Sequence, residues 1–203
     1  MINQYSLISR KNRISNLFIY LIAIFFYNCE NTIIKIPNEV DYGIVINEIN
    51  YRSSATFNPE DWLELFNTTS EGVEIGLWSF KDDNNNVFIF PENLKIESGE
   101  YLVLCKNYQM FSQFFPGVTN VIGDFGFGLS GGGELLRLFD ANEQLVDQVE
   151  YNDIYPWPTE PDGTGPTLEL INPYVENDIA SNWVSSIANG SPGSVNSIYN
   201  ADE

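Results

Sequence analysis

The chain contains no histidine and only two cysteines, Cys29 and Cys105. The missing histidine removes the commonest general base and the commonest metal ligand, which excludes Ser-His-Asp and Cys-His catalysis and most zinc sites. Two cysteines allow one disulfide at most, so a fold held together by many disulfides is also excluded. We expect no cofactor and no metal site.

Basic residues are scarce as well. The 203 residues include 28 acidic and only 9 basic side chains, for a net charge of −19. A surface this acidic repels phosphate backbones, so we expect no nucleic acid partner. Divalent cations and basic protein surfaces remain open as partners, and solubility alone also accounts for such acidity.

Long hydrophobic runs are absent except near the N-terminus, where eleven apolar residues extend from Leu17 to Tyr27 behind the basic stretch SRKNR. A helix of that length spans about 16 Å, whereas a bilayer core is about 30 Å thick. The run is therefore typical of a signal peptide, and we interpret residues 1–29 as a signal peptide or membrane anchor helix.

A cysteine follows this run, at the position where bacterial lipoprotein signals have theirs. The segment resembles a lipobox, and the resemblance implies that Cys29 is the lipid attachment site. Phe26, Tyr27 and Asn28 stand where such boxes usually have small residues. A lipoprotein, an uncleaved membrane anchor and a secreted protein therefore all remain open, and all three place the rest of the chain outside the cytoplasm. We expect residues 30–42 to be a polar connector.

From residue 43 onward, apolar residues alternate with polar ones in short bursts separated by turn-forming residues. The bursts are IVINEI (44–49), WLELF (62–66), VFIF (87–90), YLVLC (101–105), ELLRLFD (134–140), QLVDQVEY (144–151) and LELI (168–171). Such a series predicts an all-β protein, an antiparallel β-sandwich or barrel of about seven to nine strands. One segment, KNYQMFSQFFPG (106–117), has helical spacing and predicts a short helical crossing whose aromatic side chains cover the core.

The order of these motifs resembles that of the lamin-tail domain, an immunoglobulin-like β-sandwich found in nuclear lamins and in many secreted or surface bacterial proteins. The resemblance covers residues 43–197 and leaves 198–203 as an acidic C-terminal tail. It runs through IVINEI, DWLELFN, GLWSFKDD, FIFPENLKIESGEYLVLCKN, FGLSGGGELLRLFDANEQLVDQVEY, PWPTEPDGTGPTLELINP, NWVSS and GSPGSVNS. The chain is most similar to the bacterial form, because the heptads that precede a lamin tail are absent.

Most residues of these motifs have structural explanations. Alternation directs Trp62, Glu64 and Phe66 to one face of a strand, and it directs Glu48 to the same face as Ile46. A carboxylate among large apolar side chains needs a hydrogen-bond donor, so we expect Glu48 and Glu64 to hold loop backbones in place. The residues that we assign to the structural motif are Glu48, Asp61, Trp62, Glu64, Asn67, Trp78 and Trp183.

These observations favour a non-catalytic, membrane-tethered module of the bacterial cell envelope that binds an envelope protein or a glycan. Three tryptophans near the loops, Trp78, Trp157 and Trp183, are candidates for the contact surface, although core packing also explains each of them. Trp157, between two prolines, is expected to be the most exposed. The alternatives are an accessory protein for a carboxylate- or metal-dependent hydrolase, and a calcium-binding surface domain. Calcium would bind at the oxygen-rich KDDNNN (81–86), although a solvated hairpin turn also explains that segment.

Overall fold

The structure, a computed structural model, describes residues 43–202, which fall within one compact unit, Val40–Glu203. Its secondary structure is almost entirely β, with one short α-helix, as the alternating pattern predicted. The predicted signal or anchor segment, Cys29 and the connector all lie outside the described residues. Within residues 43–202, no helix is long and apolar enough to cross a membrane.

Twelve strands can be assigned in the described range, more than the seven to nine expected, because several are only two or three residues long. The elements are β1 (Ile44–Asn50), β2 (Trp62–Asn67), β3 (Val73–Glu74), β4 (Ser79–Lys81), β5 (Val87–Ile89), β6 (Lys95–Ile96), β7 (Tyr101–Cys105), α2 (Tyr108–Phe114), β8 (Val121–Gly123), β9 (Gly133–Phe139), β10 (Leu145–Asn152), β11 (Leu168–Leu170), the 3-10 turn η1 (Ala180–Asn182) and β12 (Trp183–Ser185).

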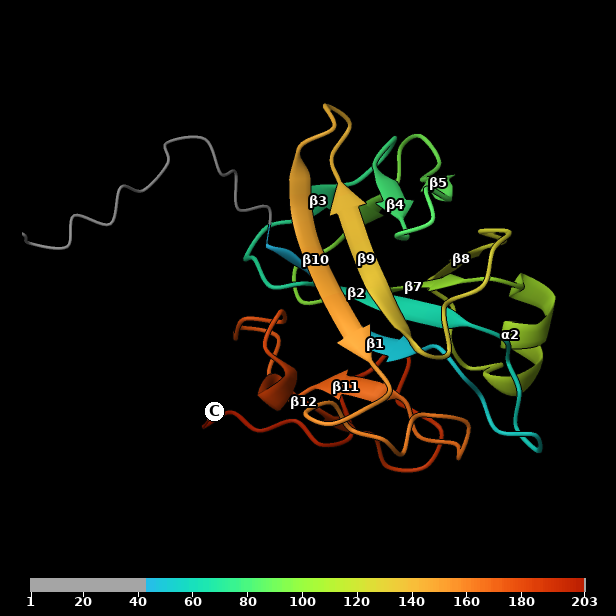
Figure 1. Ribbon diagram of the computed structural model, residues 1–203. Helices are drawn as coiled ribbons and strands as arrows, with labels where there is room; N and C mark the ends of the chain where they lie inside the picture. Colours follow the sequence, from blue (N-terminus) through green and yellow to red (C-terminus); the bar gives the residue numbers. More distant parts are fainter. Residues whose placement is uncertain (1–42, 203) are drawn as a thin grey trace, which may run out of the picture. The chain divides into compact units, whose positions relative to one another are not determined.

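Two main sheets form the fold. The larger has the order β12-β11-β1-β2-β7-β8, the smaller has the order β10-β9-β4-β5, and β3 pairs with β6 in a separate ribbon. One apolar cluster contains residues of both main sheets, among them Leu63 and Leu65 of β2 and Leu136 and Leu138 of β9. Figure 1 shows β9 and β10 crossing the strands of the larger sheet. The hydrophobic core therefore lies between the two sheets.

The larger sheet is mixed, which differs from the purely antiparallel prediction. β8 pairs with β7 in parallel, whereas the other paired strands of the main sheets are antiparallel. The chain passes through α2 between these two strands, and such a crossover returns it in the same direction.

The predicted helix covers the outer side of β2 and β7. It begins at Asn107, whose side chain accepts a hydrogen bond from the Met110 amide and so caps the first turn. The buried ring of Phe111 packs edge-on against Trp62, with ring centroids 5.7 Å apart. This second apolar cluster is separate from the core between the sheets.

Two expectations about side-chain placement were wrong. A β-bulge between Ile46 and Glu48 adds one residue to β1, so Ile46 and Ile49 both enter the core and Glu48 lies opposite Glu64 on the outer side. Simple alternation had placed Glu48 with Ile46. Trp157 is only 8% exposed, because its ring packs against Trp183 at a centroid distance of 6.0 Å.

Candidate functional site

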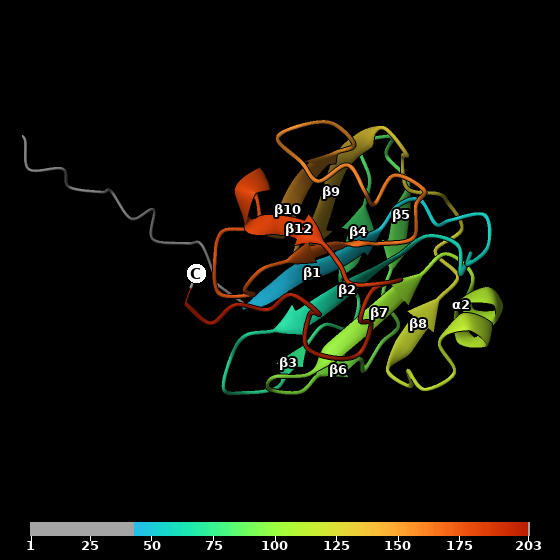
Figure 2. The ribbon, with the colours of Figure 1, turned by 90° about the horizontal axis from the view of Figure 1, so that it is seen from below.

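The outer face of the larger sheet is covered by the end of the described chain, residues 186–200, which we call the C-terminal segment. Figure 2 shows it crossing in front of β1 and β2. Backbone hydrogen bonds fix both ends of the segment. Ser186 N donates to Thr167 O at 3.0 Å, and Asn200 N donates to Ile171 O at 2.9 Å. This cover shields much of the outer face of β1, β2 and β11 from solvent.

Three glutamates lie beneath the C-terminal segment, one on each of β1, β2 and β11. Glu48, Glu64 and Glu169 are all 0% exposed. Gly193 N donates to Glu64 Oε2 at 2.5 Å, and Asn47 Nδ2 donates to Glu64 Oε1 at 3.0 Å. The sheet thus holds the C-terminal segment through a carboxylate that accepts from its backbone.

The other two glutamates hold the same segment. Glu48 Oε1 accepts from Thr167 Oγ1 at 2.5 Å and from Ser191 N at 3.1 Å. Glu169 accepts from the hydroxyls of Ser191, at 2.6 Å, and Ser197, at 2.7 Å. All of these donors are neutral, so the carboxylates are hydrogen-bonded without a charge partner among these contacts.

Burial dominates the electrostatics of this cluster. It raises the pKa of Glu64 to about 8, against the opposing effect of the hydrogen bonds from Gly193 and Asn47. It also raises the pKa of Glu48 well above its usual value, and the neighbouring Glu64 and Glu169 raise it further. Desolvation disfavours the charged form of a carboxyl group, so Glu48 and Glu64 retain protons that an exposed glutamate would release. Sealed from solvent, they serve as attachment points for the C-terminal segment.

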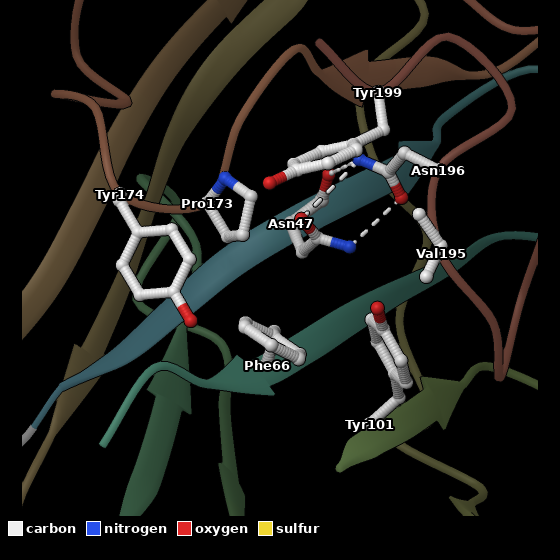
Figure 3. A pocket seen from close by; sticks show the side chains of 8 residues that line it. All are labelled: Asn47, Phe66, Tyr101, Pro173, Tyr174, Val195, Asn196 and Tyr199. Atoms are coloured by element: carbon white, nitrogen blue, oxygen red, sulfur yellow. Dashed lines mark hydrogen bonds between the residues drawn. The ribbon is translucent and has the colours of Figure 1, made fainter. Parts of the chain in front are cut away.

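A pocket of about 200 Å³ opens beside this cluster (Figure 3). Its walls come from β2, β7 and the chain after β11. The residues that line it are Asn47, Phe66, Tyr101, Pro173, Tyr174, Val195, Asn196 and Tyr199.

Aromatic rings form most of the pocket wall. Phe66 and Tyr101 pack side by side with centroids 4.7 Å apart, while Tyr174 and Tyr199 are 66% and 43% exposed. In Figure 3 the four rings surround the hollow from different sides. Large, partly exposed aromatic side chains around a concave surface are typical of ligand sites.

Two buried asparagines form the polar floor of the pocket. Asn47 Nδ2 donates to Asn196 Oδ1 at 2.8 Å as well as to Glu64. Asn196 Nδ2 donates to Leu170 O at 2.7 Å and to Asn47 O at 3.1 Å. The amide hydrogens of the floor are therefore already used within the protein, and Asn47 connects the pocket to the buried glutamates.

Asp61 and its neighbour Glu60 also serve structural contacts. Both converge on one cation, because they precede β2 in a loop, where adjacent side chains need not point to opposite faces. Lys106 Nζ lies 2.7 Å from Glu60 Oε2 and 3.7 Å from Asp61 Oδ2. Asp61 Oδ2 also accepts from Leu129 N at 3.0 Å.

The other residues assigned to the structural motif lie in the interior. Asn67 ends β2 and ties down the next loop, since its Nδ2 donates to Glu71 O at 2.8 Å and to Ile96 O at 2.9 Å. Trp78 and Trp183 belong to the core between the sheets. The indole Nε1 of Trp183 donates to Asn177 O at 2.7 Å.

The segment considered for calcium forms the turn between β4 and β5. The buried Asp82 accepts from Asn86 N at 2.8 Å and from Asn86 Nδ2 at 2.6 Å, which fixes the turn. In the part of the chain that the structure describes, no group of three or more acidic, cysteine or histidine residues could hold a metal ion.

Sequence reasoning missed Glu169 and the pocket. Glu169 stands between two leucines in LEL, the same pattern that marked Glu64 in LELF, so this signal was available. Tyr101, Tyr174 and Tyr199 had no comparable signal. They come from segments far apart in the chain, and only the path of the C-terminal segment brings them together.

The comparison with curated protein sequences found no match. A solved structure that is similar is the 2.50 Å crystal structure of a DUF4876 family protein from Bacteroides thetaiotaomicron. It is 10% identical, the alignment covers 73% of this chain and 69% of that chain, and the TM-score is 0.46.

A family model gives the assignment. The model of the Lamin Tail Domain matches residues 39–153, a stretch that contains β1 to β10 and ends before β11. Because the match covers more than half of the chain, the protein belongs to the lamin-tail domain family.

Proposed function

We propose that this lamin-tail domain is a non-catalytic binding module of the bacterial cell envelope, with an immunoglobulin-like sandwich as its scaffold. The observation that carries the proposal is the open aromatic pocket on the outer face of the larger sheet, with Tyr174 and Tyr199 exposed at its rim. Sandwich domains commonly bind partners through segments carried on a rigid pair of sheets.

The hydrogen bonding of the acidic residues supports a non-catalytic role. Glu48 and Glu64 are buried acceptors for the C-terminal segment, and Asp61 is engaged by Lys106 and Leu129. A general acid or base must reach the proton that it transfers. Glu48, Asp61 and Glu64, which sequence patterns had singled out, are instead occupied within the protein.

The proposed location is extracytoplasmic, with the chain tethered to the membrane through its N-terminus. The basic stretch, the short apolar run and the cysteine that follows them support it. Labelling of cells with a palmitate analogue tests the anchor. We expect incorporation into the wild-type chain and none into Cys29→Ala, and equal labelling of the two would refute lipid attachment at Cys29.

Binding is tested with isolated cell envelopes and a chain that lacks residues 1–29, because the proposed membrane anchor would hold a full-length chain on the envelope whether or not the pocket binds. We expect the wild-type chain to sediment with envelopes stripped of the endogenous protein, and the double variant Tyr174→Ala/Tyr199→Ala to remain in solution. The matched control is Tyr155→Ala, which removes a tyrosine that is 89% exposed and does not line the pocket.

The contrast between the two variants decides the proposal. If the control variant binds as the wild type does and the pocket variant does not, the pocket is the binding surface. If the pocket variant sediments as fully as the wild type, or if the wild type does not sediment, the proposal fails. Thermal melting of each variant checks that it is folded.

A further inference from the structure

The pocket has no charged residue among the eight that line it. Its floor amides donate to Glu64, Asn196, Leu170 and Asn47, so their hydrogens are not available to a ligand. An anion would find no cation here, and a sugar would find no amide donor for its hydroxyl groups. The lining therefore offers no charged group to an anion, and only its tyrosine hydroxyls remain to hydrogen-bond a sugar.

The ring faces and the charge of the protein favour a cation instead. The face of an aromatic ring carries negative electrostatic potential, which attracts a cation placed over it. The whole chain also has a net charge of −19, which raises the local concentration of cations. Burial, followed by the nearby Glu64, raises the pKa of Tyr101 to about 12, so this phenol stays neutral.

The apolar members of the wall restrict the kind of cation. Phe66, Pro173 and Val195 offer carbon surface and no hydrogen-bond acceptor on their side chains. A primary ammonium or a metal ion would lose its hydration there without replacement, whereas a cation covered with methyl groups loses little.

We propose that this pocket is an aromatic cage for a quaternary ammonium group, which Tyr101, Tyr174 and Tyr199 contact through their ring faces. The inference deepens the proposed function, on which it rests, by naming the chemical class of the ligand. The volume fits, because about 200 Å³ is smaller than the roughly 300–1,000 Å³ of pockets for drug-sized ligands and suits a small headgroup.

The test compares two ligands of the same shape. Choline and its uncharged carbon isostere, 3,3-dimethylbutan-1-ol, are titrated into the full-length wild-type chain, and binding is followed by calorimetry and by the NMR signal of the ligand methyl groups. We expect choline to bind at least tenfold more tightly and its methyl signal to move upfield over the rings. Equal affinities, or no detectable binding of choline, would overturn the proposal.

Variants show whether choline binding depends on the aromatic rings or on the phenol hydroxyls. Tyr174→Phe and Tyr199→Phe keep the rings and should bind choline within about twofold of the wild type, whereas Tyr174→Leu and Tyr199→Leu should weaken binding about tenfold. Tyr155→Leu is the control for loss of an exposed ring elsewhere. If the leucine variants bind as tightly as the wild type, the cage is not the site.

Two further measurements identify the source of the quaternary ammonium group and distinguish the cage proposal from the envelope-binding proposal. Binding of free choline, without any vesicle binding that depends on the pocket, identifies a small soluble ligand, whereas binding to phosphatidylcholine vesicles that the leucine variants lose identifies a lipid headgroup. If envelopes bind through the pocket while choline does not bind, the ligand class is wrong and the binding module stands. If choline binds while envelopes do not, the cage stands and the envelope role fails.

Discussion

Glu64 provides a sharp test of the buried glutamate cluster, through the pH dependence of stability. Its pKa is raised from 4.5 to about 8 in the folded protein. Between these values the folded state holds a proton that the unfolded state has released. The free energy of unfolding therefore falls as pH rises, by up to about 1.4 kcal/mol per pH unit for a single independent group.

The perturbation is Glu64→Gln, which removes the titration but keeps the shape of the side chain. The new amide nitrogen faces a donor, either Gly193 N or Asn47 Nδ2, so the variant should be less stable at pH 5 by about 1–3 kcal/mol. From pH 5 to pH 7.5 the wild type should lose up to about 3 kcal/mol that the variant does not lose. The difference between the two proteins should therefore shrink or reverse.

Urea unfolding at pH 5, 6, 7 and 8 measures this difference. Tryptophan fluorescence is a suitable signal, because all four tryptophans are buried in the described domain. Glu92→Gln, at an exposed position, reports the effect of removing one surface carboxyl. A stability difference between wild type and Glu64→Gln that stays constant from pH 5 to pH 8 would refute the reasoning that burial raises this pKa.

Two further predictions concern the cover of the sheet and the second cysteine. Gly190 has φ +93°, and an added Cβ would overlap an oxygen of the buried Glu48, so Gly190→Ala should lower the free energy of unfolding by more than about 1 kcal/mol. The control Gly132→Ala, whose added Cβ would enter open space, should change the free energy of unfolding by less than about 0.5 kcal/mol. Similar urea midpoints for the two variants would contradict this prediction. Burial, and then the charge of Asp124, raises the pKa of the Cys105 thiol to about 12. In a Cys29→Ala background the native protein should therefore resist a thiol reagent at pH 8 and react after unfolding, and rapid reaction of the native protein would show that the thiol is accessible.

Much of the secondary structure could be predicted because it depends on local alternation. In β9, Leu136 and Leu138 are buried in the core and Arg137 between them is only partly buried, as a period of two requires. Helical spacing likewise marked α2, and its buried Phe111 covers Trp62. The three-residue strands β5 and β11 lie within the predicted bursts VFIF and LELI. Other short strands, such as β3 and β6, escaped prediction, because two residues have no measurable period.

Side-chain placement was predicted only where the strands are regular. β2 follows the alternating pattern, whereas the extra residue in β1 reverses the assignment of Glu48. Trp157 was predicted to be exposed from its flanking prolines, but a distant partner, Trp183, buries it. A local pattern contains no information about which distant segment will cover a given side chain.

The sequence by itself determined the charge, the absence of histidine chemistry and the positions of the longer strands along the chain, because composition and local periodicity are properties of the chain alone. Only the tertiary structure decided that Glu48, Glu64 and Glu169 gather beneath the C-terminal segment and that an aromatic pocket opens beside them. The contact between Gly193 and Glu64 joins residues 129 positions apart. Such contacts exist only after the sheets have paired and the chain has returned across them, so no local pattern could reveal the site.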